Sequence, residues 1–340
     1  MDKKISRRKF VRITAIGAGI LAVGGFSLKE SLKESGVQAY EETRPLLGTY
    51  ITIKAIDIDE DKAKAAVIDT FAEINRLSSI LSRHDPASEL YRLNNNKQII
   101  GASTELVAVL EKAQQYSELT EGAFDVTVMP LLDIYQTSFK KKNGAPDTAA
   151  LNDASSLVGY KMIKISGHDV VLEKDGAVTL DGIAKGYIVD KAATCLRERM
   201  MNRVIVEAGG DLSLSGTRED GQPWRVGITH PRAMGGYYEV FESNSGCLAT
   251  SGDYENSFTS DYRYHHIIDP RQGLCPTELA SASVLANDTS YADALSTACL
   301  VLGTQKALAL VESLPGVEAL LIDKDLINYK TSGFPPSAAF

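Results

Sequence analysis

Short strand-like segments succeed one another in the second half of the chain, and most are separated only by turn residues. They read NRVIVEAGGDLSLSG, WRVGITH, YYEVFES, YHHIIDP and ASASVLA. Strands joined by short turns pair antiparallel, whereas a doubly wound parallel sheet needs a helix between successive strands. The clustering therefore predicts an α+β fold with largely antiparallel sheets and packed helices. Neither an internal repeat nor a linker divides residues 40–340, so we expect a single unit there.

Amphipathic helices supply the α part of this pattern. Val67, Phe71, Ile74 and Leu81 recur at helical spacing between residues 60 and 82, which predicts a helix with one buried face. Further helices are expected after a capping Ser103, over residues 184–200, and in SYADALSTACLVLG and TQKALALVESL. Further strands are expected in GTYITIKAI, KMIKIS, DVVLEKDGAVTL, VEALLID and LINYKTSG.

The charge distribution excludes one class of partner. The net charge is −8, and residues 1–39 contribute +5 of it through eight Lys/Arg and three Asp/Glu. The rest of the chain therefore carries −13. Proteins that bind nucleic acid need a basic surface to neutralise phosphates. We expect no nucleic-acid partner.

The N-terminal segment has the pattern of an export signal. A basic start is followed by an apolar run from Ile13 to Leu28, too short for a comfortable membrane span. SRRKFVR resembles the twin-arginine motif, and VQA at residues 37–39 is a plausible cleavage site. We interpret residues 1–39 as a twin-arginine signal peptide, with an uncleaved anchor as the alternative. The mature protein would lie in the periplasm or on the outer face of the cytoplasmic membrane.

The stretch TLDGIAKGYIVDK places Gly182, Lys185 and Gly186 between a strand-like run and a helix. One interpretation is a turn with a solvated lysine. The other is a phosphate site, because a helix N-terminus offers free N–H groups and a partial positive charge. The chain has no P-loop sequence, so any phosphate site would be of another kind.

Asp293 and Thr297 are four residues apart in a predicted helix, so their oxygens share one face. A carboxylate, a hydroxyl and backbone carbonyls suit a hard cation such as Mg²⁺. Ordinary helix polarity is the alternative. Together with the lysine-bearing turn, the pair suggests a site for a nucleotide diphosphate.

Other polar residues lie in short stretches that each have an ordinary structural explanation. Asp125 and Asp269 could form turns, and His266 could be a hydrogen-bonded core histidine. The remaining candidates are Gly209, Gly210 and Asp211 after an apolar strand, Thr250, Ser251 and Gly252 in an expected polar turn, and His265.

Seven motifs together give a more specific indication. LLGTY, GAFDVTVMPL, LDGIAKGYIVDK, EAGGDLSLSG, TSGDYEN, HHIIDPRQG and DTSYADALSTACLVLG follow one another as in the ApbE family, which the chain resembles from Arg44 to Asp323. The resemblance implies a T-fold-related α+β unit and an FAD:protein FMN transferase. Such an enzyme uses Mg²⁺, moves FMN from FAD onto a threonine hydroxyl as a phosphoester, and releases AMP.

The resemblance also implies roles for particular residues. FAD contacts are expected at Leu47, His84, Ala123, Phe124, Asp125, Thr179, Lys185, His266 and Ser296. The Mg²⁺ ligands would be the Gly182 carbonyl, Asp293 and Thr297. Many family members have Asp where this chain has Thr179, and Asp181 lies close by. The threonine hydroxyl is a weak nucleophile and needs a base, for which His266 and Asp181 are both candidates.

The resemblance implies a partner as well. The acceptor would be a membrane-associated respiratory subunit carrying (Asp/Ser)-Gly-Ala-Thr-(Ser/Thr). DGAVT at residues 175–179 approaches this motif but has an extra valine, so self-flavinylation is not expected. Two other functions remain open: an FAD pyrophosphatase that yields FMN and AMP, and a non-catalytic exported flavin-binding or redox protein.

Replacing Arg7 and Arg8 with Lys should trap the precursor in the cytoplasm, because the twin-arginine pathway reads this pair. The measurement is cell fractionation followed by immunoblotting, with Lys3→Arg and Lys4→Arg as control. Unchanged export of the double variant would refute the twin-arginine interpretation.

Overall fold

The computed structural model describes residues 36–338 except 143 and 234. The interpretation of residues 1–39 as a signal therefore falls almost wholly outside the described residues. Gln38 and Ala39, at its end, lie in a strand and pair with Asp57 and Ile56. Within the described ranges, no helix is both long and apolar enough to cross a membrane.

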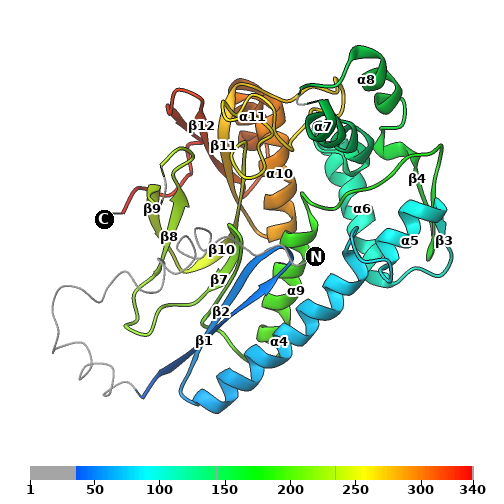
Figure 1. Cartoon of the computed structure of the whole chain (residues 1–340). Coiled ribbons are helices and arrows are strands. Elements are labelled where there is room, and N and C mark those ends of the chain that lie inside the picture. The colour runs from blue at the N-terminus through cyan, green and yellow to red at the C-terminus, as the bar shows by residue number, and fades with distance from the viewer. Residues whose placement is uncertain (1–35, 143, 234, 339–340) are drawn as a thin grey trace.

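An eight-stranded sheet forms one half of the molecule (Figure 1). Its spatial order is β1-β2-β6-β7-β10-β11-β12-β13, and every neighbouring pair is antiparallel. The strands are β1 (Gln38–Leu46), β2 (Thr49–Asp57), β6 (Val204–Ala208), β7 (Asp211–Ser215), β10 (Ser245–Gly252), β11 (Leu279–Ala286), β12 (Glu318–Asp323) and β13 (Asn328–Lys330).

The two faces of this sheet are covered by different elements. Helices α4 (Glu60–Leu81), α9 (Ala184–Glu198), α10 (Thr289–Leu302) and α11 (Thr304–Glu312) pack on one face. A hairpin of β8 (Trp224–Thr229) and β9 (Tyr237–Ser243) packs on the other, with Trp224 and Phe241 in a second core. Side chains alternate across a strand, so one strand serves both cores. In β7, Leu212 and Leu214 enter the hairpin core, which leaves Asp211 on the helix side.

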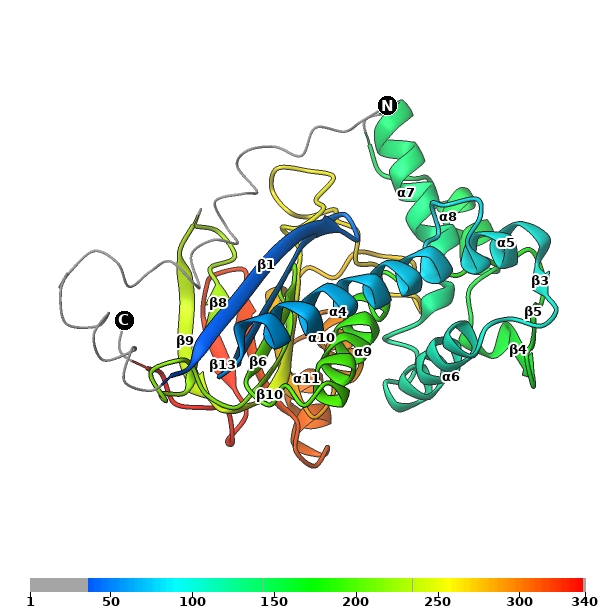
Figure 2. The same cartoon turned by 90° about the horizontal axis from the view of Figure 1, so that it is seen from below.

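A smaller lobe lies beyond the end of α4, which runs from the sheet toward it (Figure 2). It contains α5 (Glu89–Asn96), α6 (Thr104–Leu119), α7 (Met129–Lys142) and α8 (Thr148–Ser155). It also contains the antiparallel sheet β3-β5-β4, with strands Gln98–Ile99, Asp169–Leu172 and Ile163–Ser166. The 3-10 turns Val126–Val128 and Tyr160–Met162 complete it.

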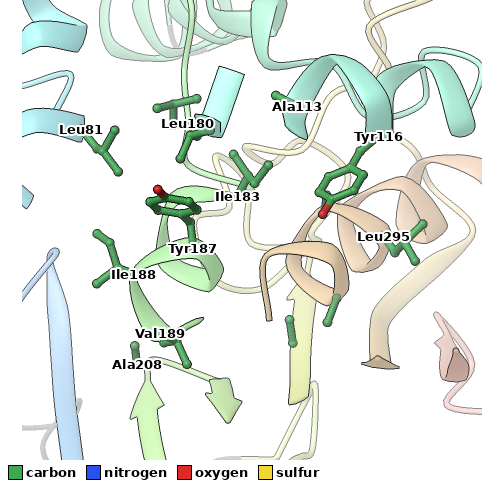
Figure 3. Close-up of a cluster of buried hydrophobic side chains, with 14 of the residues drawn as sticks. Leu81, Ala113, Tyr116, Leu180, Ile183, Tyr187, Ile188, Val189, Ala208 and Leu295 are labelled. Carbon is green, nitrogen blue, oxygen red and sulfur yellow. The ribbon is translucent and has the colours of Figure 1, made fainter. Parts of the chain in front are cut away.

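The main core is continuous between the sheet and the smaller lobe. Figure 3 shows Leu180, Tyr187 and Ile188, from α9 and its preceding turn, beside Leu81 of α4, with Leu295 of α10 on the far side of the view. All five belong to the same buried cluster. Burial of a large apolar side chain contributes about 1.5–3 kcal/mol. This shared core fixes the helix ends that face the site.

Helices α9 and α10 approach each other closely at Gly186. A Cβ added there would lie 2.8 Å from the Ser290 Cα and closer still to the Thr289 carbonyl oxygen. The Asp190 carboxylate, one turn further along α9, accepts hydrogen bonds from the N–H groups of Thr289 at 2.6 Å and Ser290 at 2.9 Å. It thereby satisfies N–H groups that the start of α10 leaves free. The crossing is therefore fixed in distance and in register.

The expected antiparallel α+β architecture is confirmed. Most expected elements also form, including α4, α9 and α6, whose N-cap is Ser103. Three expectations were wrong. YHHIIDP is a loop, because the backbone N–H groups of His266 and Asp269 bond to Asn256 and Leu274 instead of a strand.

The other two wrong expectations concern the segment after β5 and the end of β10. The strand in DVVLEKDGAVTL ends at Leu172, because Val178 and Thr179 bond to the side chain of Asn94 and the carbonyl of Val126. Thr250, Ser251 and Gly252 do not form a turn; they end β10 and pair with β11.

Gly186→Ala should destabilise the protein even though alanine is the better helix former. The added methyl group meets backbone atoms of α10, which cannot rotate away, so we expect a loss of roughly 1–3 kcal/mol. The measurement is the free energy of unfolding from a urea titration. Gly236→Ala is the matched control, because its nearest atom beyond chain neighbours is 4.0 Å away. Equal stability of the two variants would contradict the close crossing.

Candidate active site

A cavity of about 660 Å³ lies where the sheet, its helices and the smaller lobe meet. Its size falls within the usual range for small-molecule sites. Of the site residues expected from the sequence, every one except Ser296 lines it: Leu47, His84, Ala123, Phe124, Asp125, Thr179, Asp181, Gly182, Lys185, His266, Asp293 and Thr297. Residues far apart in the chain are thus brought around one space.

Two hairpin turns form part of the wall. Leu47 and Gly48 join β1 to β2 with φ of 54° and 71°, and Gly209 and Gly210 join β6 to β7 with φ of 61° and 104°. A Cβ on Gly209 would lie 2.6 Å from Thr49 Oγ1, so the turns pack tightly together. The left-handed conformation costs a leucine about 1–2 kcal/mol. The fold accepts this strain where Leu47 faces the cavity.

The Asp125 carboxylate is committed to its own loop. It accepts hydrogen bonds from Thr127 N at 2.8 Å, Thr127 Oγ1 at 2.6 Å and Tyr160 N at 2.7 Å. Burial raises the pKa of Asp125, against the effect of these hydrogen bonds. Asp125 therefore shapes the wall, and its neighbours Ala123 and Phe124 supply further surface of it.

Lys185 and two buried carboxylates form the charged end of the cavity. Lys185 Nζ forms an ion pair with Asp211 Oδ2. Burial disfavours the ammonium, but Asp211 and Asp293 outweigh it and raise the pKa of Lys185 above its ordinary value. Burial and repulsion from Asp211 raise the pKa of Asp293. The lysine is therefore not a solvated turn residue, and it remains charged.

The same end fits a divalent cation. Asp211 Oδ1 is buried and finds no hydrogen-bond partner within the described part of the chain. With both carboxylates ionised, this end would carry one negative charge more than the ammonium offsets, and a cation would balance it and favour the ionised form of Asp293. Asp293 Oδ2 already accepts from Gly186 N at 3.1 Å. A Cβ on Gly182 would lie 3.2 Å from Thr297 Oγ1, so these two expected ligands are close together.

The available donors are all oxygens, which suits Mg²⁺ better than Zn²⁺. The described residues contain no group of three or more His, Cys, Asp or Glu arranged for a metal. Mg²⁺ sites are often of this kind, with few carboxylates and with phosphate oxygens of the substrate completing the shell. The residues present therefore fit Mg²⁺ bound together with a phosphorylated substrate.

Ser296 lies behind the wall rather than in it. It is fully buried, its hydroxyl donates to Asp293 O at 2.8 Å, and it bonds Ser251 Oγ at 2.8 Å. Ser251 Oγ in turn lies 3.0 Å from Thr297 Oγ1. Ser296 thus supports two of the expected metal ligands through the backbone of Asp293 and the hydroxyl of Ser251.

His266 is a neutral imidazole on another wall. Burial, the neighbouring His265 and Lys185 lower its pKa to about 4, against the effect of Asp181. His266 Nδ1 is buried without a hydrogen-bond partner in the described ranges. The backbone N–H of His266 is fixed by Asn256 O at 3.1 Å. The ring is therefore held at the cavity in a form that can accept a proton.

Asp181 is engaged by a residue that the sequence analysis missed. Arg83 Nε donates to Asp181 Oδ2 at 3.0 Å, and Arg83 Nη2 lies 2.9 Å from the same oxygen. Arg83 directly precedes His84, which is exposed at the cavity. Asp181 N also donates to Thr179 Oγ1 at 3.3 Å. Asp211 was likewise left out of the expected site, although its stretch EAGGD was noted.

Comparisons with known proteins identify the family to which the sequence is similar. The sequence profile of the ApbE family matches residues 47–321. A Vibrio cholerae protein named FAD:protein FMN transferase is 33% identical over 306 residues, covering 86% of this chain and 90% of the relative.

Two solved structures have the same fold. The ApbE protein of Thermotoga maritima is 29% identical with a TM-score of 0.79, covering 87% of this chain and 98% of that one. A structure described as the flavin transferase ApbE from Vibrio cholerae is 30% identical with a TM-score of 0.76, covering 89% and 100%.

The imidazole of His266 should titrate near pH 4 in the metal-free protein, because burial disfavours the imidazolium. It should therefore stay neutral as pH falls from 8 through 5, whereas an unperturbed histidine takes up its proton near about 6.5. The measurement is NMR of ¹³C-labelled histidine, with the signal assigned by its loss in His266→Gln. A midpoint near 6.5 would contradict this assignment of the ring to a buried, neutral state.

Proposed function

The chain belongs to the ApbE family, and we propose that its cavity transfers FMN from FAD to a threonine hydroxyl of a partner protein. The chain is a flavin transferase that moves FMN from FAD to a protein. The threonine acceptor, the release of AMP and the dependence on Mg²⁺ belong to the proposal. One observation carries it: the cavity combines a charged, cation-fitting end with a neutral imidazole.

The proposed reaction balances as a phosphoryl transfer. The threonine Oγ attacks the phosphorus that bears riboflavin and forms a new P–O bond. The bond from that phosphorus to the bridging oxygen breaks, and AMP leaves with this oxygen and the bond's electron pair. The hydroxyl proton goes to a base. Catalysis of such a step rests on positioning and on stabilising charge as the leaving group departs.

Lys185 and the first turn of α9 face the diphosphate in this proposal. The ammonium offsets phosphate charge, and the N-terminal end of the helix adds a partial positive charge. Asp211 holds Lys185 in place through its ion pair. Gly182, Asp293 and Thr297 would hold Mg²⁺, which supplies Lewis-acid stabilisation of phosphate charge when bound.

His266 suits the role of base better than Asp181. The imidazole is neutral across the physiological range and lines the cavity. The Asp181 carboxylate is bound by the Arg83 guanidinium, so accepting a proton would weaken that ion pair. We therefore assign proton acceptance to His266 and a positioning role beside Gly182 to Asp181.

The partner and the compartment follow from the N-terminal pattern and the family. We propose that the acceptor carries the (Asp/Ser)-Gly-Ala-Thr-(Ser/Thr) motif on a membrane respiratory subunit. The twin-arginine-like SRRKFVR supports export to the periplasm or the outer face of the cytoplasmic membrane. An exported enzyme would meet acceptor domains that face the same compartment.

The deciding experiment mixes residues 40–340 with FAD, Mg²⁺ and a domain bearing the acceptor motif, followed by intact-mass spectrometry. A mass increase of one FMN on the acceptor, lost when its threonine is changed to Ala, supports the proposal. AMP and FMN released at the same rate without acceptor would favour an FAD pyrophosphatase. FAD that remains intact and reversibly reducible would favour a flavin carrier.

Asp293→Asn should sharply raise the Mg²⁺ concentration needed for transfer, because it removes the formal charge among the three expected ligands. The amide oxygen can still accept from Gly186 N, so the fold should persist. Thr297→Val removes a neutral ligand and should have a smaller effect. The measurement is initial transfer rate against Mg²⁺ concentration, with the exposed Asp153→Asn as control. If Asp293→Asn showed the wild-type Mg²⁺ dependence, Asp293 would not be a ligand and the metal would bind elsewhere.

His266→Gln should slow transfer by about 10²–10⁴-fold, the usual contribution of a general base. FAD affinity should change little, since glutamine retains polarity at a similar volume. Asp181→Asn should reduce FAD affinity and transfer rate together, because it releases Arg83. The measurements are FAD binding by fluorescence and single-turnover transfer. A large rate loss confined to Asp181→Asn would exchange the two roles.

A further inference from the structure

One wall of the cavity is built from a long loop. The segment between β10 and β11, residues 253–278, contributes Glu255, Asn256, His266–Ile268 and Pro270 to the lining. Within it, the structure describes only two isolated bridges, Ser257 with His265 and Asp269 with Leu274. A loop with so little ladder pairing needs another anchor to hold His266 in a fixed place.

Asp253, the first residue of this loop, is completely buried. Its carboxylate accepts two parallel hydrogen bonds from Arg232, Nη1 to Oδ1 and Nη2 to Oδ2, both at 2.8 Å. Lys324 Nζ donates to Oδ2 as well. The backbone N–H of Asp253 bonds to Ala280 O at 3.1 Å. Bidentate pairing of arginine with a carboxylate fixes orientation as well as distance.

The two cations come from separate parts of the fold. Arg232 follows β8, and Lys324 follows β12. Both also reach the middle of the loop: the Arg232 guanidinium lies 4.2 Å from the Tyr262 ring centroid, and Lys324 Nζ donates to Tyr262 O at 3.3 Å. Tyr262 itself has a φ of 57°. One carboxylate therefore joins the segments that follow β8 and β12 to the start and the middle of the cavity loop.

A second set of contacts holds the part of the loop that contains His265 and His266. His265 is fully buried and its Nε2 donates to Pro276 O at 2.9 Å, while Cys275 Sγ lies 3.3 Å from His265 O. Ser257 Oγ donates to Tyr264 O at 3.1 Å. Displacement of Tyr262 would therefore be transmitted to the adjacent residues 264–266.

We propose that Asp253 is a positioning residue. Through its ion pairs with Arg232 and Lys324, it holds the cavity wall that contains His266 at a fixed position relative to the charged end of the cavity. This inference rests on the proposed transfer to a protein hydroxyl. Lys185, Asp293 and Gly182 belong to α9, α10 and the loop before α9, and among the described residues no hydrogen bond or ion pair joins them to this ion network. Loosening the network should therefore impair transfer far more than FAD binding.

The primary test is Asp253→Asn, which keeps the shape and removes the charge. We expect FAD affinity within about threefold of wild type and a single-turnover rate at saturating FAD and Mg²⁺ lowered by about tenfold or more, as misplacement of reacting groups produces. Arg232→Lys keeps the charge but loses the two-pronged geometry. Arg232→Lys should also lower the transfer rate while leaving FAD affinity nearly unchanged. It replaces Asp253→Asn as the test variant if Asp253→Asn does not fold.

Glu239→Gln is the matched control, because Glu239 is a buried carboxylate paired with Lys330 at 2.8 Å in the hairpin layer, outside the cavity lining. It should lower the thermal midpoint without separating rate from affinity. The proposal is overturned if Arg232→Lys transfers FMN at the wild-type rate, or if rate and affinity fall together.

Limited trypsin digestion supplies a readout that does not depend on activity. Arg263 is exposed in the loop, and cleavage there should accelerate by about tenfold or more in Asp253→Asn and Arg232→Lys, and not in Glu239→Gln. Unchanged cleavage would overturn the anchoring. Absence of transfer by the wild type would instead overturn the proposed function, while the digestion would still decide whether Asp253 holds the wall.

Discussion

The crossing of α9 and α10 at Gly186 is the contact on which the site depends. The absence of a side chain lets the helices approach until Gly186 N reaches Asp293 Oδ2 at 3.1 Å. The neighbouring residue, Lys185, then forms an ion pair with Asp211 from the sheet and is also attracted by the Asp293 carboxylate. A larger residue at Gly186 would separate the helices, and the cation-fitting end of the cavity would lose its geometry.

The cavity has a charged end and, on another wall, a neutral imidazole. Its charged end holds an ammonium and two carboxylates, which suits a diphosphate together with a divalent ion. His266 is kept neutral by burial and by neighbouring positive charge, which suits the acceptance of a proton from a hydroxyl. The two ends belong to different parts of the fold, the helix layer and the loop after β10. Their relative position is therefore a property of the whole domain.

Much of the fold followed from local pattern. The periodicity of α4 and the Ser103 cap of α6 are short-range signals, and both elements form as expected. The errors came where backbone groups have distant partners. Val178 bonds to the side chain of Asn94, and His266 to the carbonyl of Asn256, so neither segment becomes a strand despite its apolar alternation. Alternation indicates which residues are buried, and it does not specify the partner of each N–H group.

The sequence by itself determined the antiparallel α+β architecture, the helical pairing of Asp293 with Thr297 and the family whose motifs the chain carries, because each depends on spacing along the chain. Only the tertiary structure decided that Asp125 supports its own loop, that Ser296 lies behind the wall, and that Arg83 binds Asp181. The same holds for the ion network around Asp253. Most of these contacts join residues far apart in sequence, and the burial of the groups involved exists only once the chain has folded.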